Sequence, residues 1–148
     1  MTEINLNQAE ADFLFAMEKV ATSNGEWDFP TMGMKVEIPL ISLDKKEKFL
    51  LDIGRGTIDL KKIKCQNRAR QVIILARLEL SGPPHRNPDG SEVPPPHIHR
   101  YKEGFADKWA YPIPEDEFHD LLDQWETLQD FMRFCNITQK PKIRKVMF

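Results

Sequence analysis

The sequence lacks the long apolar runs that mark membrane proteins and secreted precursors. Its 148 residues contain no stretch of about 18 consecutive apolar residues, the length that a helix needs to cross a bilayer. The first twenty residues carry Glu3, Glu10, Asp12 and Glu18, where a secretory signal needs a basic start and an apolar centre. We therefore expect a cytoplasmic protein with no membrane partner.

Cysteine is scarce, and the common metal-binding motifs are missing. The two cysteines, Cys65 and Cys135, lie far apart, and the chain has neither a CxxC pair nor an HExxH motif. This argues against a disulfide framework of the kind found in small secreted proteins. Both thiols are expected to be reduced and buried or half-buried.

No internal repeat and no flexible linker divides the chain, and its length suits one domain with its own core. Helical spacing of apolar residues predicts an N-terminal helix within residues 1–24 and a C-terminal helix within residues 114–136. The basic tail, residues 137–148, either adds an edge strand or hangs free.

Residues 32–112 change to an alternation of period two, which is typical of strands. The strongest strand is "RQVIILARLEL", residues 70–80, and apolar residues on both of its faces indicate a central position in a sheet. Short strands and tight turns without helices between them indicate antiparallel pairing. The predicted fold class is α+β: a single domain with a meandering antiparallel sheet, open or barrel-like, flanked by an N-terminal and a C-terminal helix.

The net charge of −2 conceals a basic middle between two acidic ends. Residues 45–111 hold fourteen Lys and Arg against eight Asp and Glu, while both flanking segments have an acidic excess. Such a patch attracts polyanions through long-range electrostatics, unless the acidic segments neutralise it. The candidate nucleic-acid-binding residues are Arg55, Lys61, Lys62, Lys64, Arg68, Arg70, Arg77, Arg86 and Arg100.

The most unusual segment is "PPPHIHRYKEG", residues 94–104, at the exit of a proline-rich loop, residues 82–96. Six prolines make this loop stiff, and a long stiff loop in a compact domain usually forms or seals a site. Residues two apart on a strand share a face, so His97, His99 and Tyr101 are expected to point the same way.

His85 lies at the other end of the loop, which can fold it back toward His97. One interpretation is a metal-free catalytic site, in which His85, His97 and His99 act as general acid and base with Tyr101 beside them. Another is structural, in which the histidines hydrogen-bond the backbone of the loop.

A metal site is the third interpretation, with the three histidines as neutral nitrogen ligands. Three cations, Arg86, Arg100 and Lys102, crowd the same segment and disfavour a metal cation there. On this argument we expect no metal ion and no cofactor.

The segment "PPPHIHRYKEG", together with "DKWAYP", resembles a signature in small uncharacterised bacterial proteins that phages and other mobile elements often carry. It is similar to domains of unknown function found in toxin–antitoxin-like neighbourhoods. The likeness runs from about Phe49 to Cys135 and is strongest over residues 82–111. It implies a bacterial or phage protein of a conflict system, and it carries no established catalytic residues.

These observations favour a nucleic-acid-directed protein of a bacterial or phage conflict system, most concretely a metal-independent, toxin-like ribonuclease. The alternative is a non-catalytic binding or inhibitor protein, such as an anti-defence protein that docks through its basic sheet. A metal-dependent enzyme using the three histidines is the third hypothesis. The corresponding partners are RNA or DNA, or a protein such as an antitoxin or a defence complex.

Overall fold

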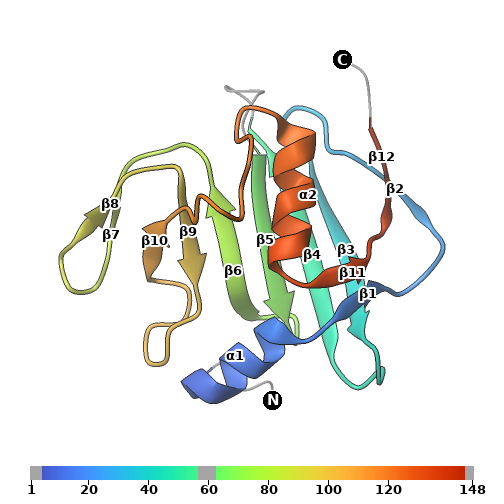
Figure 1. The fold of residues 1–148 in the computed structure, drawn as a ribbon, viewed down its shortest axis with the longest axis horizontal. Helices are drawn as coiled ribbons and strands as arrows, with labels where there is room; N and C mark the ends of the chain where they lie inside the picture. The colour runs from blue at the N-terminus through green and yellow to red at the C-terminus, as the bar shows by residue number, and fades with distance from the viewer. Residues whose placement is uncertain (1–4, 57–62, 146–148) are drawn as a thin grey trace.

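A computed structural model describes residues 5–56 and 63–145 of the chain (Figure 1). Lys61 and Lys62, two of the expected nucleic-acid-binding residues, lie outside the described residues. The elements are α1 (Gln8–Ala16), β1 (Lys19–Ala21), β2 (Glu26–Asp28), β3 (Lys35–Ser42), β4 (Lys48–Arg55), β5 (Ile63–Ala69), β6 (Ile73–Glu79), β7 (His85–Arg86), β8 (Glu92–Val93), β9 (His97–Arg100), β10 (Ala110–Pro112), α2 (Gln124–Phe134), β11 (Ile137–Gln139) and β12 (Lys142–Arg144).

Eight strands form one sheet in the order β10-β9-β6-β5-β4-β3-β1-β11. Its pairs are antiparallel except for β1 with β11, and two small sheets pair β12 with β2 and β7 with β8. The predicted α+β class is therefore confirmed. The sheet is open rather than barrel-like, because β10 and β11 lie at its two ends without pairing to each other within the described residues.

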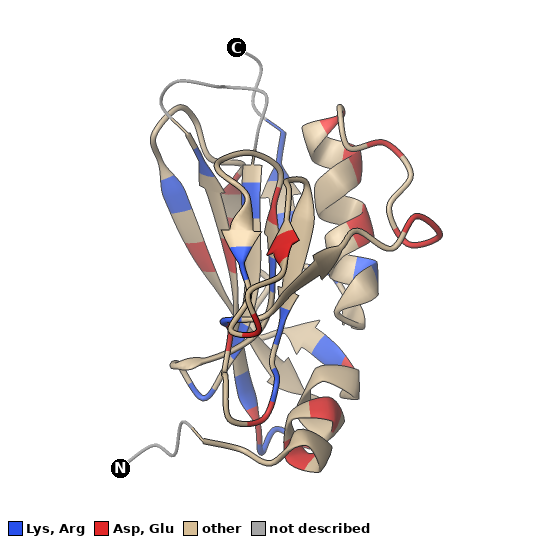
Figure 2. Cartoon of the chain, turned by 90° about the vertical axis from the view of Figure 1, so that its left-hand side faces the viewer, with Lys and Arg blue, Asp and Glu red and all other residues tan. Residues whose placement is uncertain are grey.

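Both helices lie on one side of the sheet, where α2 packs against β5 and α1 against β6 (Figures 1 and 2). Alternate residues of the central strands turn toward these helices, as the period of two predicts. The core on this side is apolar and includes Ile38, Leu40, Leu51, Ile53, Cys65, Leu78, Leu128, Phe131 and Met132. Neither described helix is long and apolar enough to span a bilayer.

Both helices are shorter than the sequence pattern indicates. Helix α1 begins after Asn7, whose side chain accepts a hydrogen bond from the Glu10 amide at 2.8 Å, and it ends before Lys19 enters the sheet as β1. Helix α2 begins only after Asp123, because the acidic segment 114–123 forms turns instead. Of the two expectations for the tail, the added edge strand is confirmed. The tail contributes β11 at the end of the large sheet, and β12 pairs with β2.

The face of the sheet opposite the helices is polar and ordered in rows. Directly paired residues of antiparallel strands share a face, so each row runs across several strands. One row is Lys35, Gly54, Lys64, Glu79 and His97, and the next is Glu37, Asp52, Gln66, Arg77 and His99. Figure 2 shows the resulting mixture of basic and acidic positions along the strands.

Candidate metal centre

The proline-rich loop returns to the sheet beside the edge strand β10 as the β7–β8 hairpin (Figure 1). Two side chains hold it there. The His85 Nε2 atom lies 2.7 Å from the Lys108 carbonyl, and the Asn87 amide bonds both backbone groups of Ala110, at 2.8 Å and 3.0 Å. The hairpin is therefore fixed at the edge of the sheet, where the ring of His85 packs beside those of His97 and His99.

Asn87→Ala should loosen this hairpin, because the buried Asn87 amide makes both of these bonds to β10. Loss of two buried hydrogen bonds should lower the free energy of unfolding by about 2 kcal/mol and the melting temperature by about 6 °C. Thermal unfolding measures the loss, and hydrogen exchange at the Ala110 amide should become faster. Asn24→Ala, in an exposed loop, is the matched control. Equal melting temperatures of the two variants would contradict the role of Asn87 in holding the hairpin.

The hairpin brings together the three predicted histidines. Their ring centroids lie 4.6 Å apart for His85 and His99, 5.1 Å for His97 and His99, and 6.1 Å for His85 and His97. His97 and His99 are both only 2 % exposed, whereas His85 is half-buried. Tyr101 is not part of this cluster, because β9 ends at Arg100 and the Tyr101 hydroxyl turns away to bond the backbone of Leu6 at 2.7 Å and 2.8 Å.

The Nδ1 atoms of His97 and His99 lie 3.1 Å and 2.8 Å from the carbonyl oxygens of Val93 and Asp107. A carbonyl only accepts, so each Nδ1 donates its proton, and the Nε2 atom of each ring is left for a partner on the other side. Burial, together with the positive charge of Arg77, lowers the pKa of His99 to about 4, so that ring is neutral at neutral pH.

The two Nε2 atoms face the carboxylate of Glu79. The His99 Nε2 atom lies 3.4 Å from Glu79 Oε1, and the His97 Nε2 atom lies 3.9 Å from Glu79 Oε2. The ligand atoms of the three residues all lie within 4.8 Å of one another. The His97 Nε2 atom is buried and has no hydrogen-bond partner in the described part of the chain. The two Nε2 atoms and the Glu79 carboxylate therefore face one another, and no hydrogen bond joins them among the described residues.

Arg77 is the one arginine bonded to this cluster within the described residues. It donates to Glu79 Oε1 at 2.7 Å and to Asp107 Oδ2 at 2.6 Å. Burial alone would raise the pKa of the Glu79 carboxyl, but the hydrogen bond from Arg77 and the charge of Lys64 hold it below its usual value. Glu79 is therefore an anionic carboxylate at neutral pH.

The cations that argued against a metal in the sequence do not lie at the cluster. Arg86 pairs with Glu92 at 3.3 Å, and Lys102 lies over the ring of Trp109 at 4.5 Å. Arg100 projects from the opposite face of β9, because it alternates with His97 and His99. The objection from these three residues therefore does not apply in space, and Arg77 is the arginine whose charge lies at the cluster.

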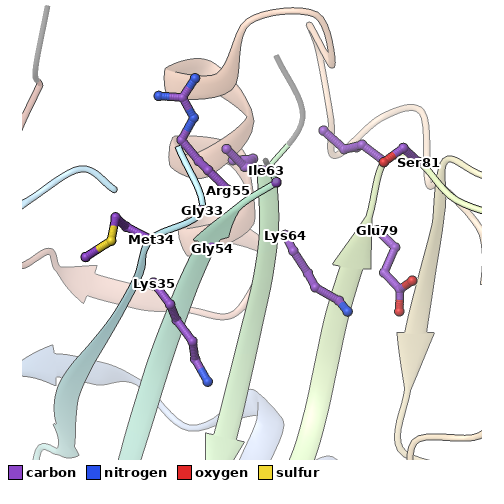
Figure 3. Close-up of a pocket in the computed structure, with 11 residues that line it drawn as sticks. Gly33, Met34, Lys35, Gly54, Arg55, Ile63, Lys64, Glu79 and Ser81 are labelled. Carbon is purple, nitrogen blue, oxygen red and sulfur yellow. The ribbon is translucent and has the colours of Figure 1, made fainter. Parts of the chain in front are cut away.

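An open cavity of about 360 Å³ adjoins the cluster, and Glu79 forms part of its wall (Figure 3). Lys35 and Lys64 line it from the same row of the sheet, and Figure 3 shows both extending on the side of the sheet that Glu79 occupies. Gly54 lies between them in that row, where an added Cβ would meet nothing within 4 Å. The Lys64 ammonium makes no hydrogen bond or close ion pair with any described residue.

Most of the predicted nucleic-acid-binding arginines are paired with carboxylates. Arg68 binds Asp52 and Glu37, Arg70 binds Glu47, Arg77 binds Glu79 and Asp107, and Arg86 binds Glu92. Arg55 is buried and lies 3.4 Å from the Pro30 carbonyl, and Arg100 lies under α1. Nucleic-acid binding by this set stays a prediction, and Lys64 is an exposed member that has no ion pair with a described residue.

The sequence pattern did not indicate Glu79, Asp107 or Asn87 as site residues. Glu79 could be found only from the register of β6 with β9, which pairs it with His97. That register depends on the long loop between the two strands, whose path no local pattern gives.

A family model described as "Family of unknown function (DUF6978)" matches residues 6–137, a range that includes the histidine cluster, the hairpin and both helices. No curated protein and no solved structure matches the chain significantly.

Proposed function

The chain belongs to the family of unknown function DUF6978, so its role has to be inferred from its own residues, and we propose that it is a metal-dependent enzyme. The observation that carries this proposal is the convergence of the His97 and His99 Nε2 atoms on the Glu79 carboxylate. Arg77 donates to Glu79 Oε1, but the buried His97 Nε2 atom has no donor among the described residues, and a cation bound between the two rings and the carboxylate would satisfy it.

The spacing of these atoms suits a zinc-type ion. Ligand atoms at about 2.0–2.1 Å from a tetrahedral metal lie about 3.3 Å from one another. His99 Nε2 lies 3.4 Å from Glu79 Oε1 and His97 Nε2 lies 3.9 Å from Glu79 Oε2, and the ligand atoms lie within 4.8 Å of one another, so the side chains would draw closer together around one ion. The bonds from Nδ1 to backbone carbonyls are the contacts that orient metal-bound histidines.

Three protein ligands leave a fourth position for water, as in catalytic zinc sites. A metal ion held by Glu79, His97 and His99 would supply activation of this water as a nucleophile at neutral pH. His85 lies beside His99 and donates from Nε2, so its Nδ1 atom can accept the proton that the water loses. The same proton can then pass to the leaving group.

The charge around the cavity beside Glu79 indicates which class of substrate the site would take. Lys35 and Lys64 place two ammonium groups along one side of it. Their charge suits a phosphate ester, whose hydrolysis joins the water oxygen to phosphorus and breaks the bond to the leaving oxygen. We therefore propose metal-assisted hydrolysis of a phosphate ester, with Glu79, His97 and His99 as metal ligands and His85 as the proton acceptor.

A direct test uses p-nitrophenyl phosphate and bis-p-nitrophenyl phosphate, with zinc, with manganese, and after removal of metal by a chelator. Activity should depend on the metal. Lys64→Met should reduce kcat/KM about tenfold, the effect of one charge-assisted hydrogen bond, and leave the metal content unchanged. Lys46→Met, in an exposed turn, is the control with the same change of charge. Metal-loaded protein that hydrolyses neither ester would contradict the reaction class.

The metal-independent ribonuclease hypothesis makes the opposite prediction, because RNA cleavage would persist in chelator. The near-complete burial of His97 and His99 favours a bound ion over direct contact with a polynucleotide. A role in conflict between a bacterial host and a mobile element stays a prediction from the sequence resemblance.

A further inference from the structure

A second cavity, of about 550 Å³, lies on the helix side of β9, opposite the histidines. It is formed where β9 and β10 meet α1, the end of α2 and the turns before α2. Its lining combines apolar surfaces from Ile98, Pro112 and Phe134 with Gln8, Arg100 and Tyr111. This volume is in the range of small-molecule sites.

Arg100 is the unusual group in this cavity. Its guanidinium lies 3.9 Å from the ring centroid of Phe15 and 5.6 Å from that of Phe134. None of its five N–H groups makes a hydrogen bond within the described residues, and its Nε atom is buried. An arginine in such a position normally has a carboxylate partner, since leaving buried donors unsatisfied is costly.

The surroundings of Arg100 add positive charge. Lys19 lies close enough that each cation opposes the charge of the other, and the Lys19 ammonium is already bonded to three backbone carbonyls. No ion pair within 4 Å joins Arg100 to a described carboxylate, although the charge of Asp12 acts on it from farther away. The inner end of the cavity is therefore positive and unneutralised.

We propose that this cavity binds a small carboxylate with an apolar or aromatic body. The fork of the guanidinium matches a planar carboxylate, and its stacking on Phe15 fixes the orientation of the fork. The Tyr111 hydroxyl, which makes no hydrogen bond within the described part of the chain, offers a further donor.

The cavity also disfavours ligands that carry more than one negative charge. Asp116 and Glu117 line it from the turns before α2, and Asp116 is exposed. These two carboxylates repel phosphates and polyanions more strongly than a single carboxylate. Ile98, Pro112 and Phe134 offer an apolar surface to the body of the ligand. The site is independent of the proposed metal centre and shares only the backbone of β9 with it.

The test uses benzoate as the probe and benzamide as its neutral counterpart, with binding followed by amide NMR shifts. Benzoate should shift the signals of Ile98, Arg100, Tyr111 and Phe134, and benzamide should bind at least tenfold more weakly. Arg100→Met should weaken benzoate binding at least tenfold while keeping the apolar stem of the side chain. Arg144→Met, which removes an exposed arginine on β12, should leave the affinity unchanged.

Thermal unfolding separates a binding role from a structural one. If Arg100 serves a ligand, Arg100→Met should melt at the same temperature as the parent or higher, because it removes an unsatisfied buried charge. A marked fall in melting temperature, with benzoate and benzamide bound equally by the parent, would overturn the proposal. Tighter binding of phenyl phosphate than of benzoate would overturn the carboxylate assignment. Absence of any shift with millimolar benzoate would also overturn it.

Discussion

Zinc is expected to bind at one ion per chain and to raise the melting temperature by about 12 °C, and His97→Ala should abolish both effects. Binding to the folded state alone adds about 4 kcal/mol when the ion is about 1,000 times more concentrated than its dissociation constant. For a chain of this size that gain corresponds to the stated shift. The ion would occupy the point where Glu79, His97 and His99 converge.

Elemental analysis after gel filtration, with thermal unfolding in zinc and in chelator, measures both effects. His119→Ala is the matched control, since His119 is exposed, bonds Asp130 and lies outside the cluster. Without zinc, His97→Ala should lose the bond to the Val93 carbonyl and the packing of a buried ring, and it should melt about 10 °C below the parent, so the zinc effect is measured as the shift within each variant. Zinc that binds equally to the parent and to His97→Ala would place the ion elsewhere and remove the basis of the proposed function.

Lys19→Met is expected to destabilise the protein by about 3 kcal/mol, or about 10 °C in melting temperature. Lys19 is fully buried in β1, and its Nζ atom donates to the carbonyls of Phe15, Met17 and Cys135 at 2.7 Å, 3.0 Å and 2.7 Å. These carbonyls join the end of α1 to the end of α2. Methionine fills the same space but leaves all three acceptors without a donor.

The pH dependence of stability offers a second measurement on the same variant. Burial lowers the pKa of Lys19 from 10.5 to about 8, so between these values the unfolded chain binds more protons at this group than the folded chain. This group therefore makes the free energy of unfolding rise between about pH 8 and pH 10.5, and Lys19→Met should lack that contribution. Lys46→Met should keep it. A smaller loss than 1 kcal/mol at pH 7 would show that water satisfies the carbonyls.

The sequence located the histidine cluster because its geometry is largely local. The spacing of His97 and His99 places both on one face of a strand, and the stiff loop returns His85 to them. The partners of the cluster are not local. Arg77 and Glu79 come from β6, and a slip of one residue against β9 would put both side chains on the helix face.

A bulge also limits what alternation can predict. The pairing of β5 with β6 shifts between Asn67 and Arg68, so Leu75 is left between two paired residues, Ile74 and Ala76. Burial in β6 consequently changes phase there, with Leu75 and Ala76 both buried. A strict period of two assigns these two neighbours to opposite faces.

The basic patch could not be predicted reliably from the charges along the sequence either. Arg68 and Arg70 appear unopposed along the sequence, but their partners Asp52, Glu37 and Glu47 come from β3, β4 and the turn between them. Summation of charge along the chain therefore overestimates the field of the folded sheet. The register of the strands decides which charges remain unpaired.

The contact between Asn87 and β10 has a consequence for self-association. As an edge strand, β10 would present the outward amide and carbonyl of Ala110 as a template for a strand of another molecule. The side-chain amide of Asn87 occupies both groups, as a neighbouring strand would. The hairpin that carries His85 thus also blocks edge-to-edge aggregation at this end of the sheet.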